Sequence, residues 1–202
     1  MHVEFLVEEP SAEAALREFL SSLLGAENTF RIHAHQGKRD LLNSLAGRLR
    51  GYSKWLPDDW RIVVLVDRDA EDCRHLKRRL NRLAKDAGLK TRADARSPGI
   101  IRVLNRIAIE ELEAWFFGDT DAIRAAYPRI PSNLSANARY RDPDAIRGGT
   151  WEALERVLQD AGYHKGGLPK IEAARRIAHH LRIENNRSVS FRAFCSGVRS
   201  LL

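Results

Sequence analysis

The chain has 202 residues, of which 44% are hydrophobic and 30% are charged, so it is long enough for one sizeable globular domain. Its formal net charge of +7 favours an anionic partner such as nucleic acid, and its two cysteines argue against a disulfide framework. No apolar run reaches the roughly 20 residues of a membrane span, and no basic stretch with an apolar core precedes the first strand. We therefore expect a cytoplasmic protein without a membrane partner.

Hydrophobic periodicity predicts strands that alternate with helices over the first half of the chain. The strands are expected at 3–7, 30–35, 61–66 and 100–109, and the helices at 12–24, 38–50, 72–87 and 110–117. We expect Ser11 to cap the first helix and Gly25 to follow its end. Repeated strand–helix units are typical of a parallel sheet with helices on both faces, so the sequence predicts an α/β fold with a mostly parallel sheet of about four strands.

The character of the chain changes after Tyr127. Residues 128–150 are rich in Pro, Gly, Asn and Arg, which predicts a long loop or insertion. Helices are expected beyond it at 151–161, 169–182 and 190–202. We therefore predict an α/β domain at 1–127, a loop at 128–150, and a C-terminal helical segment at 151–202 that packs on the same domain.

Carboxylates follow two of the predicted strands. Glu8 and Glu9 come after the first strand, and Asp67 and Asp69 follow the wholly apolar run 62–66. The carboxyl ends of parallel strands meet at the edge of the sheet where such folds bind ligands. Two acids spaced two residues apart can point at one hard cation such as Mg²⁺ or Mn²⁺. The alternative is that Asp67 and Asp69 merely cap the helix that follows.

A third acidic cluster consists of Glu110, Glu111 and Glu113 and begins where the fourth strand is expected to end. Carboxylates from several strand ends can hold one or two cations that polarise a phosphate and generate the attacking hydroxide. The same glutamates can instead favour a helix N-terminus through its dipole. The sequence leaves both interpretations open.

Two of these acidic segments resemble the motifs of the Toprim domain, which occurs in topoisomerases, primases and OLD-type nucleases. Its first motif, a hydrophobic strand followed by Glu and then Ser/Thr-x-Glu, is similar to residues 5–13, FLVEEPSAE. Its Asp-x-Asp motif is similar to residues 64–69, VLVDRD. Glu9 departs from the first motif, because Toprim domains usually have glycine there.

Two further segments resemble a bacterial Toprim-like family of unknown function. They are residues 109–119, IEELEAWFFGD, and residues 163–170, YHKGGLPK. Members of that family are often encoded beside an ABC-type ATPase of the OLD kind. The resemblance implies a Toprim-like (Rossmann-like) fold and a Mg²⁺- or Mn²⁺-dependent nuclease or phosphodiester-processing subunit. It further implies work with a partner ATPase in phage defence or DNA processing.

The resemblance also implies roles for individual residues. Glu8 would be a metal ligand or general acid/base, and Asp67 and Asp69 would be metal ligands. The candidate ligands are Glu8, Glu9, Asp67, Asp69, Glu111 and Glu113, the last two for a second metal. The candidate catalytic residues are Glu8, Asp67, Asp69, Lys165 and Lys170, with the two lysines stabilising phosphate charge.

The helix expected at 72–87 is strongly basic. Its leucines recur at helical spacing and form a buried stripe, which leaves the bases on the solvent face. These bases are Arg74, Lys77, Arg78, Arg79, Arg82 and Lys85. They either form a solvated face or contact the phosphates of a nucleic acid. We expect DNA rather than RNA as the partner, and a homodimer stays open.

Two other functions remain as alternatives. One is a non-catalytic subunit that binds nucleic acid or assists assembly while keeping a Toprim shape. The other is a metal-independent ribonuclease of the HEPN type, suggested by the spacing of Arg175 and His180. His33 and His35 could bind a transition metal, although surface histidines are the simpler interpretation. The absence of Gly-x4-Gly-Lys-Ser/Thr and Gly-x-Gly-x-x-Gly argues against a P-loop ATPase and a dinucleotide site.

Overall fold

A computed structural model gives the fold and describes residues 1–94 and 101–202. One sheet contains the strands β1 (His2–Val7), β2 (Thr29–Ala34), β3 (Trp60–Asp67) and β4 (Val103–Ala108). The strand order is β2-β1-β3-β4, and each neighbouring pair is parallel. The predicted α/β class with a parallel four-stranded sheet is confirmed. Ile100, the first residue of the fourth expected strand, and Pro98 and Gly99, expected to form a turn before it, lie outside the described residues.

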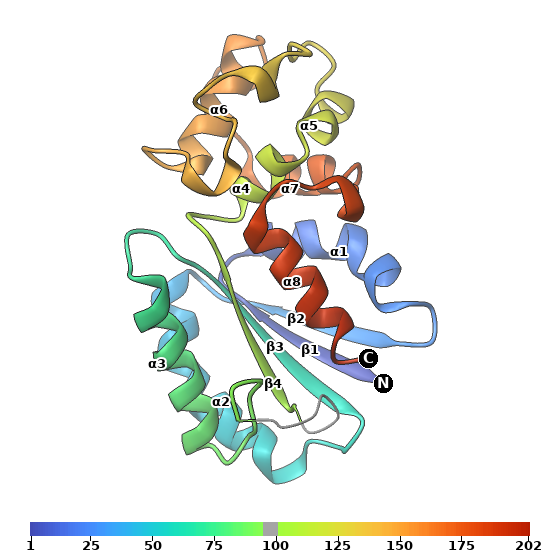
Figure 1. The fold of residues 1–202 in the computed structure, drawn as a ribbon, viewed down its shortest axis with the longest axis vertical. Helices are drawn as coiled ribbons and strands as arrows, with labels where there is room; N and C mark the ends of the chain where they lie inside the picture. The colour runs from blue at the N-terminus through green and yellow to red at the C-terminus, as the bar shows by residue number, and fades with distance from the viewer. Residues whose placement is uncertain (95–100) are drawn as a thin grey trace.

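Helices cover both faces of the sheet. They are α1 (Pro10–Leu24), α2 (Lys38–Trp55), α3 (Cys73–Asp86), α4 (Glu113–Gly118), α5 (Thr120–Ala126), α6 (Thr150–Asp160), α7 (Lys170–Ala178) and α8 (Val189–Arg199). Helices α2 and α3 lie on one face of the sheet and α1 and α8 on the other, while α4, α5 and α6 lie beyond the carboxyl ends of the strands (Figure 1). Among residues 1–94 and 101–202, none of the helices combines the length and the hydropathy that a membrane span needs.

The larger core joins the sheet to the C-terminal helices. Trp115 on α4 is fully buried, and its Nε1 donates a hydrogen bond to Ser190 Oγ at 3.0 Å. Phe194 on α8 lies with its ring centroid 5.0 Å from that of Trp115 and 6.3 Å from that of Phe5 on β1. Since one apolar cluster runs from β1 to α8, the C-terminal helical segment is part of the same folded unit as the sheet.

The smaller core lies between the sheet and the layer formed by α2 and α3. Leucines at helical spacing face the strands, among them Leu41 and Leu45 on α2 and Leu76 and Leu80 on α3. All four are fully buried, as amphipathic helices on a sheet require. The opposite faces of both helices are left for solvent.

The segment expected to be a long loop or insertion, 128–150, packs against the rest of the fold. It contains the short helices η2 (Leu134–Ala136) and η3 (Pro143–Ala145), and the Tyr140 ring stacks on Phe117 with centroids 4.9 Å apart. Asp144 accepts hydrogen bonds from the backbone N–H groups of the first turn of α8, at 2.6 and 3.1 Å. The segment therefore has little regular secondary structure, but apolar residues spaced among its prolines pack against the neighbouring helices.

Some predicted helix boundaries were wrong. Ser11 does not cap α1, because the helix begins at Pro10 with Glu9 in the N-cap position. Helix α7 ends at Ala178 rather than at residue 182, and the short helix η4 (Ile183–Asn185) follows it. The side chain of Ile171, in the first turn of α7, is 46% exposed. The first turn of α7 therefore extends beyond the core.

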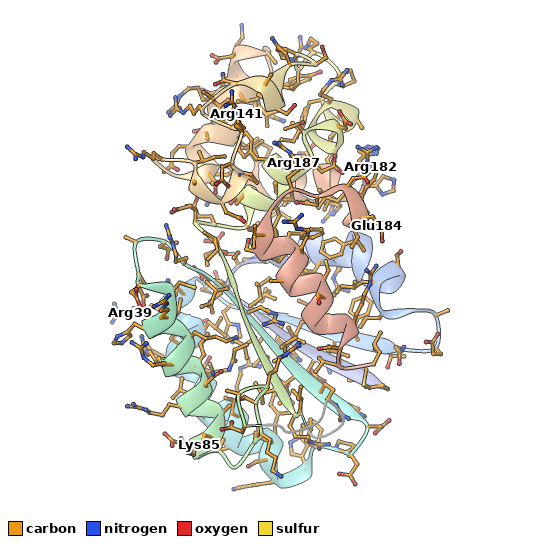
Figure 2. The ribbon with its side chains drawn as sticks, viewed as in Figure 1. Arg39, Lys85, Arg141, Arg182, Glu184 and Arg187 are labelled. Atoms are coloured by element: carbon orange, nitrogen blue, oxygen red, sulfur yellow. The ribbon has the colours of Figure 1, made fainter. Side chains whose placement is uncertain are left out.

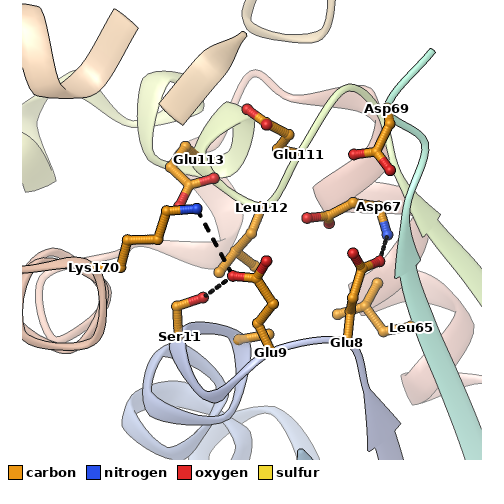
Figure 3. Close-up of a pocket in the computed structure, with 11 residues that line it drawn as sticks. Glu8, Glu9, Ser11, Leu65, Asp67, Asp69, Glu111, Leu112, Glu113 and Lys170 are labelled. Carbon is orange, nitrogen blue, oxygen red and sulfur yellow. Dashed lines mark hydrogen bonds and ion pairs between the residues drawn. The ribbon is translucent and has the colours of Figure 1, made fainter. Parts of the chain in front are cut away.

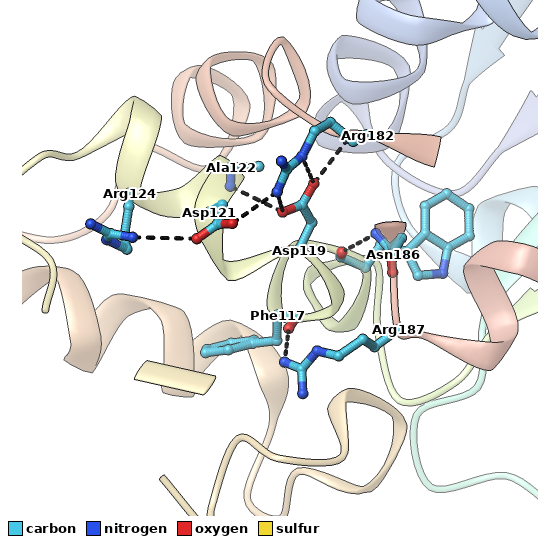
Figure 4. A network of polar contacts seen from close by, with 9 residues as sticks. Phe117, Asp119, Asp121, Ala122, Arg124, Arg182, Asn186 and Arg187 are labelled. Carbon is cyan, nitrogen blue, oxygen red and sulfur yellow. Dashed lines mark hydrogen bonds and ion pairs between the residues drawn. The ribbon is translucent and has the colours of Figure 1, made fainter. Parts of the chain in front are cut away.

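A network of polar contacts fixes α4 and α5 to the segment before α8 (Figure 4). Asp119 caps α5 by accepting from Ala122 N at 3.3 Å, and it also accepts from the backbone N and guanidinium of Arg182, at 3.0 and 3.2 Å. Asn186 Nδ2 donates to Trp115 O at 2.8 Å. These contacts hold α4 in place, and α4 carries Glu113 to the edge of the sheet.

Candidate functional site

Six carboxylates surround one small pocket at the carboxyl edge of the sheet (Figure 3). They come in pairs from the carboxyl ends of β1, β3 and β4 and the segments that follow them. The pairs are Glu8 and Glu9, Asp67 and Asp69, and Glu111 and Glu113. The cavity has a volume of about 40 Å³, and Ser11 and Lys170 complete its polar wall. The structure thus brings together all six residues that the sequence proposed as metal ligands.

Strand pairing sets two of these carboxylates side by side. Val7 of β1 lies opposite Leu65 of β3, so Glu8, the residue after β1, comes level with Val66 and next to Asp67 at the end of β3. The backbone N–H of Asp67 donates a hydrogen bond to Glu8 Oε2 at 3.1 Å. The apolar run of β3 is buried on both faces, which forces the first polar side chain after it toward the edge of the sheet.

The capping alternative for Asp67 and Asp69 does not hold. The N-cap of α3 is Asp72, whose side chain accepts from His75 N at 2.6 Å. Asp69 adopts a left-handed backbone conformation with φ of 51°, within the turn that precedes the helix. The two aspartates of the Asp-x-Asp motif are therefore not engaged by the helix.

Two of the outer carboxylates already have cationic partners. Asp69 Oδ2 lies 3.1 Å from Lys38 Nζ, which also contacts Glu71 at 3.1 Å. Glu9 Oε2 accepts from Ser11 Oγ at 3.2 Å and lies 3.9 Å from Lys170 Nζ. These lysines form ion pairs at the rim of the pocket, and from there the charge of Lys38 also acts on Glu8 and that of Lys170 on Glu113.

Glu111 caps a helix from a distance. Its Oε2 accepts from the N–H and hydroxyl of Thr150, at 2.8 and 2.9 Å, and from Trp151 N at 2.8 Å. These donors form the first turn of α6, whose own N-cap residue is Gly149 and offers no side chain. Glu111 therefore does favour a helix N-terminus, but the helix is α6 and not the helix α4 that follows it in the chain.

The three inner carboxylates, Glu8, Asp67 and Glu113, are not compensated by any Lys or Arg ion pair within the described residues. Burial raises the pKa of Glu8 to about 7, and the negative charge of Asp69 adds to the effect. Burial likewise raises the pKa of Glu113 to about 7. For Asp67, burial and then the charges of Glu8 and Glu113 raise the pKa well above its usual value. In the described residues, no ammonium or guanidinium group therefore pairs directly with a carboxylate at the centre of the pocket.

Glu110 has a structural role outside the pocket. It pairs with Arg68 and adopts a left-handed backbone conformation with φ of 61°. Its carbonyl oxygen accepts from Asp69 N at 2.9 Å, which ties the end of β3 to the end of β4. This bridge holds the second and third acidic segments together.

The two predicted catalytic lysines separate in the structure. Lys170 begins α7 and lines the pocket, and its Nζ lies 4.4 Å from the ring centroid of Trp151. Lys165 is exposed in the turn before α7 and is not part of the pocket wall. The structure thus places one cation of the C-terminal segment at the site and leaves the other outside it.

Lys38 is a residue at the site that the sequence reasoning missed. Its Nζ donates to Arg68 O at 3.0 Å as well as to Asp69, and its side chain is only 13% exposed. The available signal was its position directly after Gly37, just past the carboxyl end of β2. That position places it at the same edge of the sheet as the acidic segments.

The histidine pair does not lie on the surface as expected. His33 pairs with the buried carboxylate of Glu4, which also accepts from Tyr52 OH at 3.2 Å. His35 is 4% exposed, and its Nδ1 lies 2.9 Å from Val7 O. The surface interpretation was wrong for His35, which is buried, while His33 is half-buried beside Glu4 and Tyr52.

Arg175 and His180 line a separate hollow of about 360 Å³ together with Glu18 and His179. They do not share one helix face, because α7 ends at Ala178 and His180 lies in the turn that follows. The spacing that suggested a ribonuclease pair therefore does not correspond to a continuous helix. The only structural support left for the ribonuclease prediction is that Arg175 and His180 line the same hollow.

A family model described as a domain of unknown function (DUF4276) matches residues 7–199. The chain belongs to the DUF4276 family. This match spans both the sheet and the C-terminal helices, in agreement with the single core that joins them. No curated protein and no solved structure matches this DUF4276 chain. The Toprim resemblance therefore stays a prediction based on the acidic motifs.

Proposed function

We propose that the pocket binds Mg²⁺ or Mn²⁺ and that the protein is a Toprim-like, metal-dependent nuclease. The observation that supports this most strongly is the uncompensated inner triad, Glu8, Asp67 and Glu113. Like charges brought together and partly removed from water must take up either protons or a cation. A divalent ion is the group that would use all three carboxylates at once.

The chemistry of the donors suits a hard cation. Every ligand candidate in the pocket is a carboxylate, and neither histidine nor cysteine lines it. Such oxygen-only sets favour Mg²⁺ or Mn²⁺ over zinc or copper. Within the described residues, no group of three His, Cys, Asp or Glu side chains is arranged to hold a metal ion as it stands. Binding therefore requires the carboxylates to turn inward, against the mutual repulsion that keeps them apart without a cation.

The residues of the pocket have distinct roles in this proposal. Asp67, Glu8 and Glu113 are the ligands at the centre, and Asp69 is a ligand at the rim held by Lys38. Once bound, the metal supplies a Lewis acid for a phosphate oxygen and an activated water. Lys170 stands on the opposite wall, where its ammonium can neutralise the charge of an approaching phosphate.

The biological setting is proposed from the motif resemblance. We propose a cytoplasmic protein that acts with an ABC-type ATPase encoded nearby, in phage defence or DNA processing. If so, co-expression with that ATPase should yield a complex that survives size-exclusion chromatography. Separate elution of the two proteins at micromolar concentration would count against the partner.

A nuclease assay tests the catalytic proposal. Wild type is incubated with DNA in Mn²⁺ or in EDTA, alone and with the partner ATPase, beside Asp67→Asn and the exposed control Asp86→Asn. We expect cleavage only in Mn²⁺, loss of at least about 100-fold in Asp67→Asn, and no change in the control. Cleavage that persists in EDTA and is lost in His180→Ala would favour the metal-independent ribonuclease instead.

A second candidate is a non-catalytic subunit that binds nucleic acid or assists assembly. The observation that favours it is the pKa of about 7 for both Glu8 and Glu113, since carboxyl groups that hold protons at neutral pH need no metal. In that case Mn²⁺ would not bind the pocket, and Asp67→Asn would leave every interaction of the protein unchanged.

A further inference from the structure

The positive charge of the chain is concentrated in one layer. Helices α2 and α3 contain eleven Lys and Arg and two Asp, which gives this layer a formal net charge of +9. The rest of the chain contains 23 Lys and Arg and 25 Asp and Glu, so its formal net charge is −2. The net charge of +7 therefore belongs to this layer and not to the molecule as a whole.

Nine of the eleven cations of this layer are exposed and form no ion pair with an acidic residue within the described residues. We call the following nine side chains the basic face: Arg39, Arg48, Arg50, Lys54, Arg74, Arg78, Arg79, Arg82 and Lys85. None of them takes part in an ion pair in the described part of the chain, whereas Lys38 and Lys77 of the same helices are half-buried and engaged. Nine unpaired charges of one sign on two neighbouring helices create a strong local field.

The basic face begins at the carboxylate pocket and runs away from it. Arg39 follows Lys38, which contacts Asp69, and α3 begins at Cys73, four residues after that aspartate. Arg39 and Lys85 lie toward opposite ends of this layer (Figure 2). The 14 residues of α3 span about 21 Å, which matches roughly six phosphates along one strand of a duplex.

We propose that the basic face binds the phosphate backbone of double-stranded DNA and leads it to the carboxylate pocket. This inference rests on the proposed function for the choice of DNA, but the binding itself requires neither metal nor catalysis. The composition of the face decides between occupants. Its one exposed large apolar side chain is Trp55, at the far end of α2, so it lacks the apolar anchors of a protein interface or a membrane-bound helix.

The same composition favours a duplex over a single strand. Proteins that hold single strands without sequence preference stack successive bases on aromatic side chains. Arginine alone, spaced along a helix, contacts phosphates and carries no base-stacking platform. The expected binding is therefore independent of sequence and strongly dependent on salt.

Fluorescence anisotropy on the intact protein tests the proposal. The probe is a labelled 20-base-pair DNA duplex in EDTA, measured between about 50 and 200 mM KCl, beside its single strand and an RNA duplex of the same sequence. The test variant is Arg74→Gln/Arg78→Gln/Arg82→Gln. The control is Arg139→Gln/Arg147→Gln/Arg156→Gln, which removes the same charge from exposed residues of the segment 128–150 and of α6. Circular dichroism confirms that both variants fold.

We expect the test variant to lose at least about tenfold in affinity for the DNA duplex. The slope of the logarithm of the binding constant against the logarithm of the salt concentration should become shallower by about 2.7, because each of the three lost phosphate contacts contributes about 0.9. The control should change affinity by less than about twofold. Equal losses in both variants, tighter binding of the single strand or the RNA duplex, or no duplex binding at low salt would overturn the proposal. Because EDTA is present throughout, a failure of the metal proposal leaves this result unaffected.

Discussion

Three carboxyl side chains, Glu8, Asp67 and Glu113, decide how the pocket behaves. Each has a raised pKa, and in each case the first cause is loss of water around the charged form. The outer carboxylates have lysines or backbone N–H groups to compensate them, so the repulsion is concentrated at the centre. If these charges are kept for function at a cost in stability, removing one of them should raise the free energy of unfolding.

Asp67→Asn removes one of the repelling charges and keeps the shape of the side chain. We expect the free energy of unfolding in EDTA at pH 7.5 to rise, because the neutral amide avoids both the burial of a charge and the repulsion from Glu8 and Glu113. Urea unfolding followed by circular dichroism measures the change. Asp86→Asn, on an exposed position of α3, should stay within about 0.5 kcal/mol of wild type. Destabilisation by Asp67→Asn would show that the carboxylate is a structural group.

The pH dependence of stability follows from the same groups. Glu8 and Glu113 have a folded pKa of about 7 against an ordinary value of 4.5, so between these limits the folded state binds more protons than the unfolded state. Without metal, the contribution of these two groups to the free energy of unfolding should therefore be greatest below pH 4.5. It should be lost as the pH rises to about 7.

Glu113→Gln isolates this contribution, because glutamine does not titrate. The difference in unfolding free energy between the variant and wild type should grow in favour of the variant from pH 4.5 to 7, in EDTA. A difference that stays constant over this range would mean that the folded pKa of Glu113 is ordinary.

Among the helices, α3 carries one lysine that differs from the rest. Lys77 was expected on the solvent face, but it is half-buried and donates to Asn105 O on the edge strand β4. Burial lowers its pKa to about 8, and the positive charge of Arg106 adds to the effect. The basic helix therefore has five exposed cations and one that packs.

The lowered pKa of Lys77 predicts a second pH effect of opposite sign. Between about 8 and the ordinary value of 10.5 the unfolded state binds more protons, so this group adds stability as the pH rises. Lys77→Met has no titrating group at this position. Between pH 8 and 10.5 the free energy of unfolding of wild type should therefore rise by up to about 3 kcal/mol relative to that of the variant. Chemical unfolding at pH 7.5, 9 and 10.5 measures the trend. Parallel curves for the two proteins would contradict the buried position.

The end of α4 depends on a glycine. A Cβ at Gly118 would lie 1.9 Å from Asn186 Oδ1 and 3.0 Å from Ser188 N, in the network that fixes α4. We expect Gly118→Ala to cost about 1–3 kcal/mol in urea unfolding through overpacking. Gly47→Ala on α2 is the matched control, because a Cβ there meets nothing within 4 Å. It should stabilise by about 0.5–1 kcal/mol, and similar effects of both variants would disprove the close packing at Gly118.

At the scale of the whole molecule, the sequence predicted the sheet and its acidic edge because both depend on local patterns. The apolar run before Asp67 and the alternation of strands and helices were sufficient to place Glu8 and Asp67 at one edge. Contacts between distant segments were not predictable in this way. Lys38 reaches Asp69, Glu111 caps α6, and Asp144 caps α8 only because the chain folds back on itself.

The C-terminal half shows the same limit. Residues 128–150 look like a loop because Pro and Gly are frequent, yet Tyr140 and Ile146 are buried in the larger core. Helix α7 looks longer than it is because apolar periodicity continues past its end. Local propensity fails here because tertiary contacts decide where each helix stops.

The measurement that tests the central claim most directly is calorimetric titration of Mn²⁺ into wild type, Asp67→Asn and Asp86→Asn at pH 7.5. We predict binding in wild type and the control, release of protons that grows as the pH is lowered toward 6, and loss of binding in Asp67→Asn. Proton release is expected because a metal must displace the protons held by Glu8 and Glu113. No Mn²⁺ binding to wild type at millimolar metal, or equal binding to Asp67→Asn, would contradict the metal site.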